Sequence, residues 1–314
     1  MRFLLRRAAF AVLSVLAATV IVFTVSRLGG DPREIYARPE GYGMSKENYE
    51  ALGKKLGLDR PLIVQYFMWV GRIIRLDFGR TLFTERPVLD VLREKAPATV
   101  QLGVVSWALA TLIGVPFGVL SAVNRGGTWD YLARGFALLG QATPAFWMAI
   151  MFIILFSVRL GWLPSGTKGE PDASMFQQLK HFVLPTVVLG THAAASYLRL
   201  TRSALLEVLD SEYIKLARAK GVSRWAVIWK HALRNALIPP LTFSALLLAG
   251  LFNGAVIAET VFGWPGIGRL AAEATFENDF PTVTAVVLFF TLLYVGMAFL
   301  ADVLYAVIDP RIRY

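Results

Sequence analysis

The side chains that could carry out chemistry are few, and none of them falls into a known catalytic pattern. The chain has no cysteine, which excludes disulfides and thiolate metal sites. Its three histidines, His181, His192 and His231, are far apart and show no ligand spacing, so we expect each to be structural. The sequence contains no Gly-x-x-x-x-Gly-Lys-[Ser/Thr] phosphate loop, no Gly-x-Ser-x-Gly elbow and no His-Glu-x-x-His helix. We therefore expect no catalytic residue, no P-loop nucleotide site, no metal and no cofactor.

One long polar stretch stands out in the otherwise apolar chain, and it covers residues 210–240. Its length suits two short helices joined by a turn. Asp210 or Ser211 can cap the first helix, because a short side-chain oxygen accepts from free N–H groups in the opening turn. Gly221 can end that helix in the left-handed conformation, which costs glycine little. The pattern therefore predicts a first helix over residues 211–221.

The second helix of this stretch is predicted to have two faces. Ser223 can cap it, and Pro239 with Pro240 must stop it. Its apolar face consists of Trp225, Ile228, Trp229, Ala232, Leu233 and Ala236, and its polar face of Arg224, His231, Arg234 and Asn235. Such a helix could rest on a membrane surface or on its own bundle, with the cations turned to water or to a partner. The pattern leaves open the alternative of a basic loop that only fixes the topology.

This stretch resembles the signature loop of ABC importer permeases, in the branch that handles dipeptides, oligopeptides and nickel. The matching residues are Tyr213-Ile214, Ala217-Arg218-Ala219-Lys220-Gly221, His231-Ala232-Leu233-Arg234-Asn235-Ala236 and Pro239. Of the wider permease signature only Ala217, Gly221 and Leu233 fit, so the match to this branch carries the resemblance. The resemblance implies that the first helix is a coupling helix, which docks in a groove of an ATPase subunit.

The resemblance also gives roles to the residues of the coupling helix. Ala217 and Gly221 would allow close approach in the ATPase groove, and Arg218 and Lys220 could pair with acidic groups there. Tyr213 and Leu216 could fill the apolar floor of that groove, and the whole expected set is Tyr213, Leu216, Ala217, Arg218, Ala219, Lys220, Gly221, His231, Arg234, Asn235 and Pro239.

The bulk composition points to a protein that crosses a membrane several times. The chain has 314 residues, of which 56% are hydrophobic and 17% charged, and its mean hydropathy is +0.55. These values are too apolar for a soluble domain. The net charge of +10 could indicate nucleic acid as a partner. Lys and Arg concentrated on one side of a membrane explain it better, so we expect no nucleic acid.

Hydrophobic runs predict an all-α integral membrane fold with six spans. The runs cover residues 8–25, 99–123, 136–158, 182–198, 241–262 and 282–307. The first could instead be a signal peptide, but about 18 apolar residues favour an uncleaved span. We divide the chain into a tail and first span over 1–28, an extracytoplasmic segment over 29–97, and a core permease domain over 98–314, with its coupling loop at about 199–240.

The basic residues of the short loops predict the orientation. With six spans, the arginines near the N-terminus, those at 125 and 134, the polar stretch and the C-terminal arginines all fall on one side, which is the cytoplasm. Both termini and the coupling loop are therefore expected inside, and the resemblance implies that the membrane is a bacterial inner membrane.

The resemblance extends to the expected outer side. It includes Leu56-Gly57-Leu58-Asp59-Arg60-Pro61, Gly161-Trp162-Leu163-Pro164 and Glu259 to Gly268. An amphipathic helix over 62–76 is expected to lie on the outer face of the bundle, because it is too charged to span. The family usually has Gly before Asp77, where this chain has Leu76, which leaves the tight turn at that position open.

Several polar residues within the predicted spans are candidates to line a pathway. They are Gln101, Ser106, Gln141, Thr143, Thr242, Ser244 and Asn253. The break at residues 140–144 could line the pathway or could only kink a helix. Glu259 could be a solvated helix end or could bond near an outer gate. Asp302 is expected at the inner end of the last span, in a structural bond or a snorkelling position.

The resemblance, which covers Leu56 to Arg311, implies a permease subunit that forms half of the pathway of an ATP-driven importer of di- or oligopeptides. It implies a second, related permease subunit, two ATPase subunits and an extracytoplasmic binding protein, besides the lipid bilayer. Nickel chelates, glutathione or another small solute remain alternative substrates. A secondary transporter driven by an ion gradient is a rival, but it would carry deep charges in several spans and an internal repeat. A membrane enzyme is a second rival, but it would need a catalytic constellation.

Overall fold

The structure, a computed structural model, describes residues 2–28, 50–51, 53–54, 58–169 and 174–308. This part of the chain is helical, and it contains no β-strand, only an isolated bridge between Arg80 and Pro87. The helices are α1 (Arg2–Leu28), α4 (Leu62–Ile74), α5 (Val88–Val123), α6 (Thr128–Ala142), α7 (Ala145–Phe152), the π-helix η2 (Ile153–Arg159), α8 (Met175–Leu209), α9 (Glu212–Ala219), α10 (Arg224–Ala226), the π-helix η3 (Val227–Ala232), α11 (Leu233–Ala236), α12 (Ile238–Val261), α13 (Ile267–Phe276) and α14 (Phe280–Ile308). The predicted helical class is confirmed in this part.

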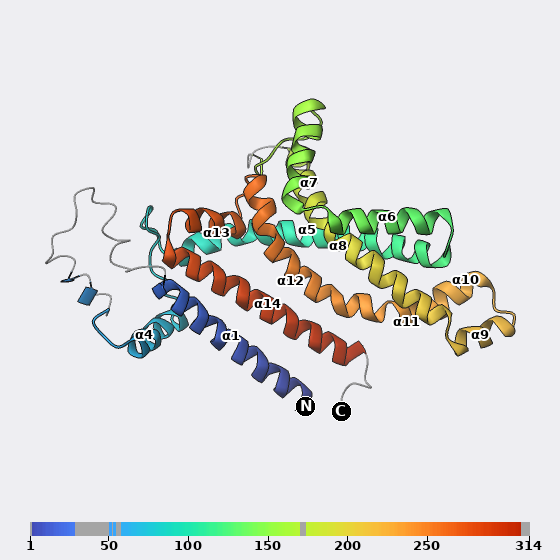
Figure 1. The fold of residues 1–314 in the computed structure, drawn as a ribbon, viewed down its shortest axis with the longest axis horizontal. Helices are drawn as coiled ribbons and strands as arrows, with labels where there is room; N and C mark the ends of the chain where they lie inside the picture. Colours follow the sequence, from blue (N-terminus) through green and yellow to red (C-terminus); the bar gives the residue numbers. More distant parts are fainter. Residues whose placement is uncertain (1, 29–49, 52, 55–57, 170–173, 309–314) are drawn as a thin grey trace.

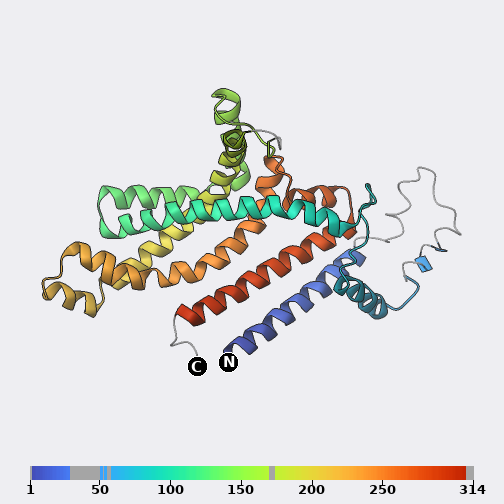
Figure 2. The same cartoon turned by 180° about the vertical axis from the view of Figure 1, so that it is seen from behind.

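The long helices form one elongated bundle (Figure 1). Helix α5 runs along α8, α6 lies along the same part of α8, and α1 lies beside α14 (Figures 1 and 2). The short helices α9, α10 and α11 cap one end of the bundle, and α13 caps the opposite end (Figure 1). We call these the loop end and the far end. Helix α7 projects sideways from the bundle in both views.

Small residues let α5 and α8 approach closely at the centre of the bundle. A Cβ added at Gly114 would come within 2.5 Å of the Ala194 carbonyl oxygen, and one at Gly118 within 2.7 Å of the Thr201 Cβ. Small residues at such crossings allow tight van der Waals packing, which holds helices together in lipid, where the hydrophobic effect does not favour their association. Helix α5 begins at Val88, before the predicted start of its span, and contains both Pro97 and Pro116.

Length and composition give three to five candidate spans in the described residues. Three helices qualify alone, namely α1 over Arg6–Leu28, α5, and α14 over Phe280–Val303. Two bent pairs qualify together: α6 with α7–η2, and Arg224–Ala236 with Ile238–Gly250, which bend by 103° and 41°. Helix α8 has 35 residues but does not qualify, because polar residues such as Thr186 and His192 interrupt its apolar run.

The predicted break in the third apolar run is present and sharp. Helix α6 ends at Ala142 and α7 begins at Ala145, so the break lies at Thr143 and Pro144. Proline at this position follows an extended residue, since Thr143 has ψ 123°. The second half of the run therefore turns away from α6 instead of continuing along it.

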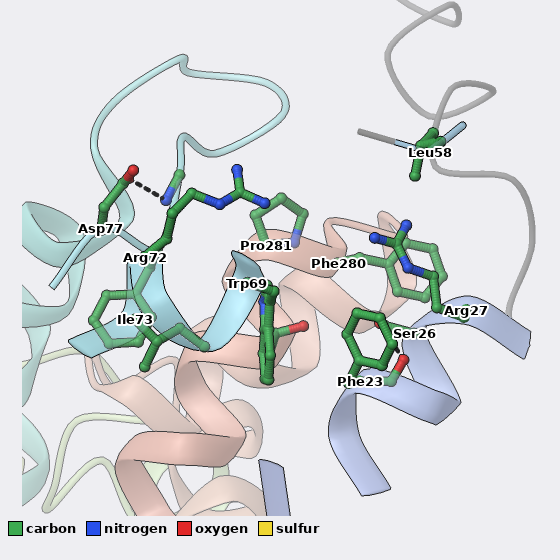
Figure 3. Close-up of a pocket in the computed structure, with 13 residues that line it drawn as sticks. Phe23, Ser26, Arg27, Leu58, Trp69, Arg72, Ile73, Asp77, Phe280 and Pro281 are labelled. Carbon is green, nitrogen blue, oxygen red and sulfur yellow. Dashed lines mark hydrogen bonds between the residues drawn. The ribbon is translucent and has the colours of Figure 1, made fainter. Parts of the chain in front are cut away.

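At the far end, the amphipathic helix α4 packs on α1. The Thr19 and Tyr66 hydroxyls are 2.9 Å apart, and the Phe23 ring packs edge-on against the Tyr66 ring. Figure 3 shows the cavity of about 130 Å³ that lies between these helices and the start of α14, with Arg27 and Arg72 among its lining residues. The helix is thus held to the first span by aromatic packing and one hydrogen bond.

The turn after α4 forms without glycine. Leu76 has a φ of 61°, in the left-handed region that favours glycine, and its N–H bonds to the Ile73 carbonyl. Asp77 then stabilises the loop by accepting a hydrogen bond from the Gly79 N–H at 3.1 Å (Figure 3). The tight turn is therefore present in this chain, at the cost of left-handed strain in a leucine.

Candidate functional site

A large cavity lies at the break between α6 and α7. Its volume is about 820 Å³, and α8, α12 and α14 complete its walls. The polar residues that line it are Gln141, Thr143, His192, Ser196 and Tyr294, and the apolar ones include Phe243, Leu246 and Leu247. We call this cavity the central groove. Apolar walls with a few placed polar groups are typical of sites that hold small molecules.

The polar residues of the central groove come from facing positions on α6 and α8. His192 and Ser196 lie one turn apart on α8 and so share a face. The Gln141 amide lies 3.4 Å from the Ser196 hydroxyl, which in turn donates to the His192 carbonyl at 3.2 Å. The groove therefore presents amide, hydroxyl and imidazole groups, which can form hydrogen bonds with a polar solute.

Only two of the predicted pathway residues line the central groove. Gln141 and Thr143 line the central groove. Ser244 instead accepts from the Trp107 indole N–H and the Tyr197 hydroxyl between helices, while Thr242 donates to the Ile238 carbonyl of its own helix. Ser106 is buried and Gln101 is exposed, both outside the groove, and the Asn253 side chain lies outside the described part of the structure.

Sequence reasoning missed three residues of the groove. His192 and Ser196 follow the i, i+4 rule on α8, which could have marked them as a polar face. Tyr294 lies in an apolar run of α14 and carries no local signal.

The polar stretch forms the two short helices that were expected at the loop end. Ser223 accepts from the Ala226 N–H, so the predicted cap of the second helix is confirmed. Gly221 has a φ of 75°, in the predicted left-handed conformation. Ser211 occupies the N-cap of α9, but its hydroxyl donates back to the Val208 carbonyl, so the predicted side-chain cap is wrong.

Helix α9 is anchored through one side chain and exposes the others. Ile214 is fully buried among Val119, Leu205, Val227 and Ala232. Tyr213 and Leu216 are 44% and 57% exposed, and Arg218, Ala219, Lys220 and Gly221 are exposed as well. Ala217 is half-buried. A short helix held at its base and open on its outer face is suited to receive a partner.

One hydrogen bond ties the two halves of the loop together. The Asn235 amide donates to the Tyr213 hydroxyl at 2.8 Å. The Val222 N–H, just after Gly221, bonds to the Ala217 carbonyl at 3.2 Å and closes the turn. Of the remaining predicted loop residues, Arg234 and Pro239 are exposed and His231 is half-buried.

The predicted apolar face of the second loop helix is buried at three positions and exposed at its two tryptophans. Ile228, Ala232 and Ala236 are buried, but Trp225 is 71% exposed and Trp229 is 49% exposed. The two indoles lie side by side, with centroids 6.0 Å apart, and give the loop an exposed aromatic surface.

A buried ion pair joins three helices next to the loop. The Arg202 guanidinium donates to both carboxylate oxygens of Asp130, at 2.8 and 3.0 Å. The Ser121 hydroxyl also donates to Asp130, and so does the Gly126 N–H. Asp130 is 1% exposed, so α5, α6 and α8 are held by a fully bonded carboxylate. A second pair, Arg7 with Asp302 at 3.3 Å, confirms a structural bond for Asp302.

A different network holds the far end, around Glu259. Its carboxylate is fully buried and accepts from the Arg269 N–H at 3.1 Å, so a solvated helix end is wrong. The Trp264 indole donates to the Ala98 carbonyl at 3.0 Å, and the Ile267 N–H donates to the Thr99 hydroxyl at 2.8 Å. We call Thr99, Glu259, Trp264, Ile267 and Arg269 the Glu259 cluster. It joins α5, α12 and α13.

Two glycines make room for this carboxylate. A Cβ at Gly266 would overlap the Glu259 carboxylate, and a Cβ at Gly268 would come within 2.6 Å of the Val256 backbone. The run Trp264-Pro265-Gly266-Ile267-Gly268 thus lets α13 begin directly against α12. The Glu259 side chain then lies at the N-terminal end of α13, which is the positive end of its dipole.

Comparison with known proteins identifies relatives over the whole chain. The family described as "Binding-protein-dependent transport system inner membrane component" matches residues 114–314, and the N-terminal family of the same system matches residues 1–103. The oligopeptide transport system permease protein AppB of Bacillus subtilis is 36% identical over 99% of both chains. The dipeptide transport system permease protein DppB of Escherichia coli is 36% identical over 100% of this chain and 99% of its own.

A solved structure shares the fold. A chain of the MetNI methionine ABC transporter, in an inward-facing conformation, aligns with a TM-score of 0.58 over 70% of this chain and 96% of that chain. Its sequence identity of 20% supports the likeness of fold alone.

Proposed function

The chain belongs to the family of binding-protein-dependent transport system inner membrane components, and we propose that it forms half of the pathway of an ATP-driven peptide importer. The observation that carries this proposal is α9, which is anchored by Ile214 and exposes Tyr213, Leu216, Arg218 and Lys220 at the loop end. Peptides are the proposed substrates because relatives that match the full length are named for dipeptide and oligopeptide transport. Nickel chelates and glutathione are lower-ranked alternatives.

The proposed assembly needs partners that supply energy and substrate. Two ATPase subunits would dock on the coupling helices of this chain and of a second, related permease, and a binding protein would deliver substrate at the far end. Closure of the ATPases would move α9, and α8 would pass that movement into the bundle, since α9 follows it directly. The two states would differ by a rigid-body rocking of the helices.

The proposed topology has six spans with both termini inside. Helices α1, α5, α8, α12 and α14 would cross, and α6 with α7–η2 would make the bent sixth passage. The loop end would then face the cytoplasm, and the arginines at 125, 134, 199 and 202 would lie on that side. Residues 29–97 would lead from the first crossing to the core at 98–314. The Glu259 cluster would lie at the outer end, where Glu259 would position an outer gate.

Substitutions in α9 test the docking role. Gly221→Asp combined with Ala217→Glu adds bulk and two negative charges to the face proposed to enter the ATPase. We expect membrane insertion to persist while peptide uptake falls at least tenfold and ATPase activity no longer responds to loaded binding protein. The measurements are uptake and ATPase assays of the reconstituted complex.

A matched control is Gly161→Asp, which imposes a similar left-handed strain, at φ 62°, in an open position between η2 and α8. It should insert and transport normally. Normal transport by the double variant in α9 would refute the docking role.

A further inference from the structure

A second cavity continues the central groove toward the loop end. It has a volume of about 600 Å³ and lies between α6 and α8. Gln141 lines both cavities, so the two adjoin at this residue. We call the second part the basic groove. Its polar residues are Tyr131, Arg134, Gln141, Arg199, Arg202 and Ser203, and Leu138 and Leu198 are among its apolar ones.

The electrostatic character changes along this surface. None of the described residues that line the central groove is Asp, Glu, Lys or Arg. The basic groove has three arginines, and no acidic residue is among those described as lining it. Arg202 is bonded to the buried Asp130, so its charge is balanced. Arg134 and Arg199 are exposed, and Arg134 lies over the Tyr131 ring at 5.9 Å. A solute that moves from the break toward the loop end therefore meets a rising positive potential.

We propose that the basic groove draws the carboxylates of the substrate toward the loop end, so that this permease favours anionic peptides over cationic ones. This inference rests on the proposed function, in which the loop end faces the cytoplasm. Gln141, Thr143 and Ser196 hydrogen-bond the uncharged part of the substrate in the central groove. Arg134 and Arg199 then attract its acidic side-chain carboxylates, since guanidinium groups match the geometry of carboxylates.

The absence of native cysteine allows the potential itself to be measured. Ser203→Cys places a thiol on the exposed lining of the basic groove. The quantity to measure in the reconstituted complex is the rate at which this thiol reacts with the anionic sulfonatoethyl methanethiosulfonate, divided by its rate with the cationic trimethylammonium reagent. Adding Arg134→Gln and Arg199→Gln should lower this ratio about fivefold. Arg125→Gln, which alters an arginine outside the groove, should leave that ratio unchanged. An equal ratio in all three backgrounds would overturn the proposal.

Transport assays then test the selectivity. With the binding protein saturated, Arg134→Gln with Arg199→Gln should lower the maximal uptake of alanyl-glutamate about fivefold and change that of alanyl-alanine by less than twofold. An equal loss for both peptides would show a merely structural role and overturn the proposal. A loss that disappears in vesicles of phosphatidylcholine alone would identify lipid headgroups as the ligand, which also overturns it. If the unmodified complex transports no peptide, the proposed function is wrong. The ratio of thiol reaction rates still tests whether the basic groove has a positive potential.

Discussion

Asp130 and Glu259 are both buried carboxylates, but the two ends of the bundle hold them in different ways. Asp130, at the loop end, is bonded by the side chains of Arg202 and Ser121, which come from two other helices, and also by the Gly126 N–H. Glu259, at the far end, is bonded by the backbone N–H of Arg269 at the start of α13. The first arrangement depends on a charge in another helix, whereas the second depends on a helix end and on glycines that leave space.

This difference bears on how each end can move. The bonds of Asp130 join α5, α6 and α8 next to the loop, so these three helices should move together when α9 is displaced. The Glu259 cluster fixes the start of α13 through the backbone N–H groups of Ile267 and Arg269. Unlike side chains, these groups cannot change rotamer. We therefore expect the loop end to be more sensitive to loss of charge, and the far end to be more sensitive to added volume.

The largest effect should follow from Asp130→Asn. It leaves the Arg202 cation partly buried without its anion, and breaking such a pair costs about 3–5 kcal/mol of the free energy of unfolding. Thermal unfolding of the purified chain in detergent measures this loss. Asp210→Asn is the control, because the exposed Asp210 pairs with Arg125 at 3.8 Å and should contribute less than about 1 kcal/mol. If Asp130→Asn also lowered the free energy of unfolding by less than about 1 kcal/mol, the loop end would not be especially sensitive to loss of charge.

Gly266→Ala tests the volume requirement at the far end. The added methyl group would overlap the Glu259 carboxylate, and overpacking of this kind costs about 1–3 kcal/mol. Gly296→Ala in α14 has open space around its Cβ and should be neutral or slightly stabilising, because alanine favours helix. Melting temperatures of the two variants give the comparison, and equal values would show that the carboxylate can shift aside.

Leu76→Gly should stabilise the protein by about 1 kcal/mol, because glycine adopts the left-handed conformation without steric strain. Leu76 is 54% exposed, so little buried area is lost. Leu76→Ala should give no such gain, since alanine retains the Cβ that causes the strain. Denaturation of the three proteins side by side separates relief of strain from loss of contacts, and a melting temperature for Leu76→Gly below that of the unmodified chain would exclude strain at this turn.

Glu259→Gln should have the smallest effect, less than about 1 kcal/mol, because the amide oxygen can still accept from the Arg269 N–H. Set beside Asp130→Asn, this near-isosteric change shows directly whether the negative charge matters at each end. A loss as large as that of Asp130→Asn would mean that a full negative charge on Glu259 is needed to stabilise the start of α13.

Local signals in the sequence predicted local structure well. The Ser223 cap, the left-handed Gly221 and the break at Thr143 and Pro144 each depend on a few neighbouring residues, and each is present. The sequence also predicted a helical membrane chain and the family to which it belongs. The cap, the left-handed glycine and the break follow from the backbone preferences of single residues.

Features that depend on distant partners were beyond that reasoning. Arg202 lies 72 residues from Asp130, and no spacing rule pairs them. The burial of Glu259 depends on how closely glycines in another segment let α13 approach. The π-helical turn η3 within the second loop helix likewise has no signal in the 3.6-residue periodicity. The roles of the loop and pathway residues remain predictions that transport assays must test.

The bend of 103° between α6 and α7 has a consequence for how the cell must make this protein. The 15 residues from Ala145 to Arg159 form an arm about 20 Å long, and Phe146 and Trp147 are half-exposed where it leaves the bundle. Met148 and Ala149 of this arm are buried against α8 and α12, so one side of the arm is fixed to the bundle and the side with Phe146 and Trp147 is open. Copies of the chain made without a protein that covers the open side would therefore expose aromatic side chains to lipid.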